Sequence, residues 1–193
     1  MVAETIAKFN FLDFIVIILF LRICYMAAKM GLSIEIFKFL GVIFSIYIGL
    51  HYYTTLSDII QKSFRPKEMP LEFMDFIVYL LLICAGYLAF VGLRSLLFRF
   101  VQLNALPRIN QIAGLLLGIG RGFLVVGMLS FTLAISSVTY LSDAVKHSSL
   151  ASKTIMILPQ TYGWLWDNLV SKFSPREKLN PTVAEALDKF SRP

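Results

Sequence analysis

Four long apolar runs dominate the first two thirds of the chain, over about residues 9–28, 34–53, 73–98 and 109–132. A helix needs about 20 mainly apolar residues to cross the hydrocarbon core of a bilayer. Each run therefore predicts a membrane-spanning helix. We expect an all-α integral membrane protein whose four spans form one transmembrane domain over residues 1–141.

After the fourth run the chain becomes more polar, and residues 142–193 predict a partly helical tail. Four large apolar side chains in this tail recur at helical spacing: Trp164, Leu165, Leu169 and Phe173. They predict an amphipathic helix over about residues 161–173 that lies in the membrane interface. A helix packed on the end of the bundle fits the same pattern equally well.

The connectors between the runs predict how the spans are arranged. Only Lys29–Ser33 separates the first two runs, so we expect these helices to form a tight antiparallel hairpin. A polar connector with two prolines, residues 57–70, separates the second run from the third.

Composition supports the membrane assignment. Hydrophobic residues make up 58% of the chain and charged residues 16%, against roughly 45–50% and 25% in soluble domains. The formal net charge of +6 suits anionic lipid headgroups. The cations lie at the ends of apolar runs rather than on one basic face, so we expect the lipid bilayer and no nucleic acid as a partner.

The cysteines and histidines predict no metal site and no cofactor. Cys24 and Cys84 lie inside apolar runs, which is typical of buried reduced thiols. His51 and His147 are far apart in sequence, and the chain contains no CxxC motif. We also find no pattern of nucleophile and base within a span, so we expect no catalytic residue.

The fourth run contains a stripe of glycines and an arginine. A helical rotation of about 100° per residue places Gly114, Gly118 and Gly122 on one face, with Arg121 at its edge. A phosphate-binding loop is excluded because no Gly-Lys-Ser/Thr ending and no preceding strand pattern are present. The stripe predicts close helix packing. Arg121 should face protein or water, since a lipid-facing cation costs at least ~2.5–3.5 kcal/mol.

Three acidic residues are candidate functional charges and candidate partners of Arg121: Asp13, Glu35 and Asp75. Asp13 and Asp75 lie in nearly identical hexamers, FLDFIV and FMDFIV, and a serpentine chain places both at one membrane face. Each could stabilise the first turn of its helix through the helix dipole, or the two could form a ring of carboxylates. Glu35 can pair with Lys38 three residues further along.

Several of these residues resemble the pattern of the CvpA family, which is named for colicin V production. The resemblance lies in the run FLDFIVI from Phe11, the run GLSIEIFKFLG from Gly31 and the run IAGLLLGIGRG from Ile112. It implies family positions at Asp13, Gly31, Glu35, Gly41, Gly114, Gly118, Arg121 and Gly122. It further implies a bacterial inner-membrane protein with four spans, required for colicin V production or export and for envelope homeostasis.

The family module also resembles one fused ahead of trypsin-like proteases that work outside the cytoplasm. This likeness implies that both termini of the chain are periplasmic. Charge counting alone gives no orientation, because the two membrane faces carry similar numbers of cations.

Two functions are compatible with the sequence. The first is a non-enzymatic membrane accessory protein that associates with other membrane proteins or with copies of itself through the glycine stripe. The second is a small transporter or channel in which Arg121 and an acidic partner line the path.

Overall fold

A computed structural model describes residues 9–64, 70–97, 107–136, 138–174, 177–183 and 185. All regular secondary structure in these ranges is helical, which confirms the predicted all-α class. The elements are α2 (Phe11–Met30), α3 (Leu32–Phe64), α4 (Leu71–Leu97), α5 (Pro107–Ala134), α6 (Thr139–His147), α7 (Ala151–Thr154), α8 (Ile157–Leu165), the π-helical turn η1 (Trp166–Val170) and α9 (Ser171–Phe173).

The four longest helices are α2, α3, α4 and α5, and each is long and apolar enough to cross a membrane. Their positions confirm the four predicted spans. The largest difference is at α3, which continues from Tyr53 to Phe64 and so includes residues 57–64 that we assigned to a connector. No glycine or proline interrupts this stretch, so the helix continues past the apolar run into polar sequence.

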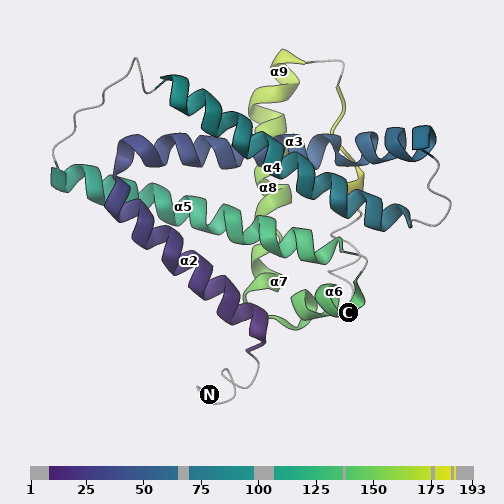
Figure 1. Cartoon of the computed structure of the whole chain (residues 1–193), viewed down its shortest axis with the longest axis horizontal. Helices are drawn as coiled ribbons and strands as arrows, with labels where there is room; N and C mark the ends of the chain where they lie inside the picture. Colours follow the sequence, from purple (N-terminus) through teal and green to yellow (C-terminus); the bar gives the residue numbers. More distant parts are fainter. Residues whose placement is uncertain are drawn as a thin grey trace.

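The turn between α2 and α3 consists of one residue, Gly31. Gly31 has a φ of 76°, a left-handed conformation that glycine adopts without steric cost. The connector is shorter than the predicted Lys29–Ser33, and the predicted tight antiparallel hairpin is wrong, because α2 and α3 diverge from the turn (Figure 1). The main partner of α2 is α5, which packs against both α2 and α3, while α4 packs along the other side of α3.

The helical stretch formed by α8, η1 and α9 crosses the spanning helices rather than running along them (Figure 1). Its inner side buries Leu158, Tyr162 and Leu165. Trp164 and Phe173 are exposed on its outer side. The helix therefore begins four residues earlier than the predicted start at Thr161, and Leu165 lies on the buried side.

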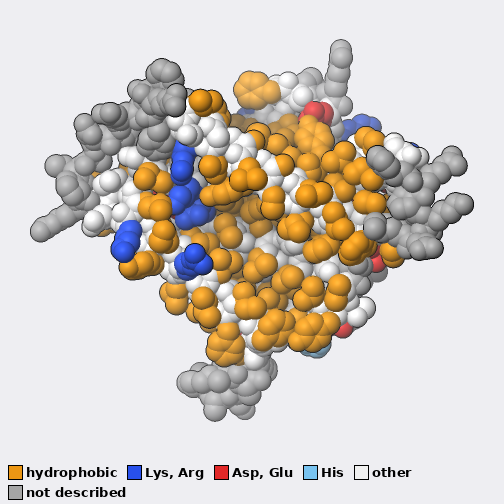
Figure 2. Space-filling view, viewed as in Figure 1, with side chains coloured by type: hydrophobic (Ala, Val, Ile, Leu, Met, Phe, Trp, Pro, Cys, Tyr) orange, Lys and Arg blue, Asp and Glu red, His pale blue; other side chains and the backbone are white. Residues whose placement is uncertain are grey.

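One hydrophobic core joins the spans to the following helices. It contains side chains from α3, α4 and α5 together with Val145 of α6, Ala151 of α7 and Leu158 of α8. Gly127 of α5 permits this docking, because a Cβ atom there would lie 2.8 Å from Leu158 Cδ1. The outer surface remains largely apolar over the spans (Figure 2).

Candidate functional site: a buried ion pair between two spans

Arg121 of α5 forms an ion pair with Glu35 of α3. Its Nε–H donates to Glu35 Oε1, which lies 86 positions away in sequence. Glu35 is 0% exposed and Arg121 is 8% exposed. The arginine therefore faces protein, and among the three candidate carboxylates its partner is Glu35.

A second cation completes the surroundings of Glu35. Lys38 Nζ lies 3.9 Å from Glu35 Oε2, one helical turn along α3. Oε2 itself accepts no hydrogen bond from the residues that the structure describes. Lys38 Nζ also donates to the sulfur of Met30 at 2.7 Å, and a thioether sulfur is a neutral, weak acceptor. One carboxylate thus lies between two cations in a buried position.

The glycine stripe of α5 brings the helix axes close enough for these contacts. A Cβ atom on Gly114 would lie 2.7 Å from the carbonyl carbon of Gly31. One on Gly118 would overlap the Cβ atom of Ala27, and one on Gly122 would lie 2.8 Å from the ring of Phe20. All three glycines therefore face α2 of the same chain, so the stripe is already occupied in a single copy.

The other two candidate glycines, Gly31 and Gly41, have different neighbours. The turn at Gly31 packs against Asn110, whose side-chain oxygen accepts the backbone N–H of Leu32 at 2.7 Å. Gly41 lies against Phe90 of α4, whose ring a Cβ atom would approach to 3.2 Å. Sequence reasoning did not single out Asn110, because a polar residue near the start of a predicted span resembles any helix end.

Asp13 lies at the far end of α2 from the ion pair and does not contact Arg121. It is 0% exposed, and its Oδ1 accepts the Ser148 hydroxyl at 2.6 Å and the Leu150 N–H at 2.8 Å. Its Oδ2 accepts the N–H of Asn10 at 2.8 Å, as a capping residue does. Asp13 therefore ties the start of α2 to the segment that precedes α7.

Asp75 has a different environment, and the two aspartates do not form a ring. Asp75 accepts a hydrogen bond from the Ser57 hydroxyl of α3, and Ser57 also donates to the Thr54 carbonyl at 3.0 Å. Asp75 is the fifth residue of α4, so it lies just beyond the first helical turn rather than within it. The matching hexamers therefore carry two unrelated contacts.

A polar cluster against α3 was not anticipated from the sequence. His51 Nδ1 lies 2.8 Å from the Tyr162 hydroxyl of α8, and that hydroxyl accepts the N–H of Asn180 at 3.1 Å. Asn180 also donates to the Leu50 carbonyl at 2.8 Å. Burial raises the pKa of Tyr162, which keeps its hydroxyl neutral. The sequence feature nearest to this cluster is the group of tyrosines at the end of the second apolar run, Tyr47, Tyr52 and Tyr53.

Among the residues described, no group of three or more His, Cys, Asp or Glu side chains is placed to hold a metal ion. The buried charges already have protein partners, as the contacts of Glu35 and Asp13 illustrate. The arrangement can thus fix the relative positions of α2, α3 and α5. Arg121 also borders an apolar cavity between the spans.

Comparison with known protein families matches residues 12–159 to the colicin V production protein family. The chain belongs to this family. The match contains all four spans and both buried carboxylate sites, and it ends within α8. The comparisons with curated proteins and with solved structures found no match.

As a member of the colicin V production protein family with four spanning helices, the chain is a multi-pass membrane protein. The segment from Glu177 to Val183, which contacts α3 through Asn180, lies beyond the family match. Its docking is therefore a feature of this chain that the family match does not cover.

Proposed function

We propose that this family member is a non-enzymatic accessory protein of the bacterial inner membrane. Its role is to support colicin V production or export, or more broadly the homeostasis of the envelope. One observation carries the proposal: the Arg121–Glu35 pair is an internal link between α5 and α3, next to the contact of Gly118 with Ala27. A charge held in this way stabilises one helix arrangement, as expected of a scaffold for other membrane proteins.

The test is complementation in a colicin V-producing bacterium that lacks its own family protein. Toxin release is measured as growth inhibition of a sensitive strain, and membrane insertion of the chain is measured in parallel. We expect the chain to restore release. The matched variants are Arg121→Leu, which breaks the pair, and Arg22→Leu, which removes an exposed cation of α2. Normal insertion with no restoration by the unmodified chain would contradict the proposal.

We further propose that both termini are periplasmic. Asn10 donates to the Ala144 carbonyl at 3.2 Å, so the start of α2 and the end of α6 lie at one end of the bundle. The likeness of the family module to one fused ahead of proteases that work outside the cytoplasm favours the periplasm for this end. A reporter fused after Pro193 that is active only in the periplasm tests this, and cytoplasmic activity would reverse the orientation.

A second candidate function is a small transporter or channel. The observation that favours it is the position of Arg121, which both pairs with Glu35 and lines a cavity between the spans. On this hypothesis Arg121→Ala abolishes a measurable flux of ions or solutes into proteoliposomes, while the protein still inserts. A flux that is equal with and without the protein would exclude the transporter and leave the accessory role.

A further inference from the structure

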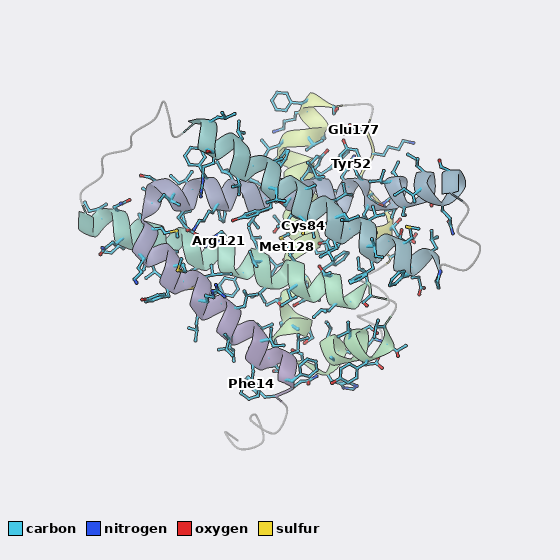
Figure 3. All side chains as sticks on the ribbon, in the orientation of Figure 1. Phe14, Tyr52, Cys84, Arg121, Met128 and Glu177 are labelled. Carbon is cyan, nitrogen blue, oxygen red and sulfur yellow. The ribbon has the colours of Figure 1, made fainter. Side chains whose placement is uncertain are left out.

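An apolar groove of about 460 Å³ lies between the four spanning helices. Every span contributes to it, including Ile23 of α2, Val42 of α3, Cys84 of α4 and Met128 of α5. Figure 3 labels Arg121 and Met128 on α5 and Cys84 on α4, and all three line the groove. Because Cys84 and Leu80 are exposed on the outer surface of α4, the groove opens towards lipid.

The polar side chains that line the groove include two hydroxyl groups, of Ser45 and Thr132, and one charged group, of Arg121. The hydroxyl groups of Ser45 and Thr132 donate to backbone carbonyls one turn earlier in their own helices, at 2.7 Å and 2.6 Å. The hydroxyl hydrogens of Ser45 and Thr132 therefore point at backbone carbonyls and not at a ligand. Arg121 is the one charged residue among those described that line the groove, and it lies nearer the start of α5 than the other α5 residues there.

More cations lie beyond that end of the groove. Lys38 is one turn before Val42 on α3 and lies 3.9 Å from Glu35, the partner of Arg121. Arg94 is seven residues past Tyr87, a groove residue of α4. Lys38, Arg94, Arg121 and Glu35 carry three positive charges and one negative charge, which leaves a net charge of +2. Lys and Arg side chains gather on the left of the face drawn in Figure 2, next to an otherwise apolar surface.

From these observations we infer that the groove binds one anionic phospholipid. One of its acyl chains lies along the apolar walls from Val42 to Met128, and its phosphate lies at Arg121, Lys38 and Arg94. Basic pockets between membrane helices recognise anionic headgroups by charge. The groove volume is within the roughly 300–1,000 Å³ of pockets that enclose small ligands.

The depth of Arg121 suits this geometry. Gly114 contacts the turn at Gly31, so it marks the level at which α2 ends and α3 begins. Arg121 is seven residues further along α5, about 10 Å along the helix axis. Lys38 is likewise seven residues from Gly31, on α3, and so lies at a similar depth. Arg94 is three residues before the end of α4 at Leu97. A free soluble anion does not explain the long apolar wall or its opening towards lipid, whereas a phospholipid explains both.

The test uses the purified full-length chain and is independent of its role in toxin production. Native mass spectrometry measures binding of phosphatidylglycerol and of phosphatidylcholine with the same acyl chains. We expect phosphatidylglycerol to bind more tightly. Removing a cation with Lys38→Gln or Arg94→Gln should weaken its binding by about fivefold for each charge. Both substitutions leave the Arg121–Glu35 pair in place.

Two further variants test whether lipid binding depends on the groove and on the cations beside it. Lys29→Gln removes an exposed cation that stacks on Tyr25, 4.8 Å from the ring centroid, outside the groove. We expect it to bind phosphatidylglycerol like the unmodified chain. Cys84→Phe fills the groove without changing a charge, and it should weaken binding of both lipids. Equal binding of the two lipids, or equal losses with Lys29→Gln and Lys38→Gln, would overturn the inference and indicate only general lipid contact.

Discussion

Gly118 of α5 and Ala27 of α2 meet with no space for another carbon atom between them. Arg121 follows Gly118 by less than one helical turn and binds Glu35 of α3. The close contact with α2 and the ion pair with α3 thus occur at the same level of α5. A change in either should disturb the other.

A bulky residue at position 118 should separate α2 from α5. We expect Gly118→Leu to lower the free energy of unfolding in detergent by about 1–3 kcal/mol, the usual cost of overpacking. Thermal unfolding followed by circular dichroism measures the loss. The matched control is Gly92→Leu on α4, where a Cβ atom meets nothing within 4 Å. Equal melting temperatures for the two variants would refute close packing at Gly118.

Removing one residue of the ion pair should lower the stability of the fold more than removing both residues. Arg121→Leu leaves the buried Glu35 carboxylate without its arginine, and the loss of one partner typically costs about 3–5 kcal/mol. The double variant Glu35→Leu with Arg121→Leu removes both charges, so it should be more stable than Arg121→Leu alone. The comparison uses thermal unfolding of the unmodified chain, of Arg121→Leu, of Glu35→Leu and of the double variant. A double variant that is less stable than either single variant would argue against the pairing.

Asp13 should control the order of the segment before α7. Asp13→Ala removes acceptors from the Ser148 hydroxyl and from the N–H groups of Ser149 and Leu150. Hydrogen bonds to charged groups contribute about 1.5–3 kcal/mol each. We expect faster hydrogen exchange over residues 148–154, measured by mass spectrometry. Asp143→Asn, at an exposed position of α6, is the control and should exchange like the unmodified chain.

Asn180 should hold the C-terminal segment on α3. Asn180→Ala removes its bonds to the Leu50 carbonyl and to the Thr54 hydroxyl at 3.2 Å, with a loss of about 1 kcal/mol. Trypsin cleavage after the exposed Lys178 should then become faster. Asn168→Ala is the control, because among the residues described the Asn168 side chain bonds within its own helical stretch, to the Trp164 carbonyl. An unchanged cleavage rate in Asn180→Ala would show that other contacts hold the segment.

The four spans were predictable because each requires a long uninterrupted apolar run, and hydrophobicity alone locates such runs. Their ends were less predictable. The polar residues after Tyr53 remain helical in α3 although they lie past the apolar run. Hydrophobicity marks where a helix leaves the membrane, whereas backbone hydrogen bonding decides where the helix stops.

The need of Arg121 for a buried partner followed from the cost of an unpaired cation in lipid, but the identity of the partner did not. Glu35 is the partner because α5 packs between α2 and α3, an arrangement that no local pattern specifies. The same limit applies to Asp13, whose partner Ser148 is 135 positions away. The functional roles of these candidate residues remain predictions.

The long separation in sequence between Glu35 and Arg121 has a consequence for the order of assembly during synthesis. Arg121 is synthesised 86 residues after its partner Glu35. In the interval Lys38, one turn along the same helix, is the nearest countercharge that can accompany Glu35 into the bilayer. We expect the early intermediate to be an open pair of helices with a locally neutralised carboxylate. Insertion of α5 then completes the bundle in one late step.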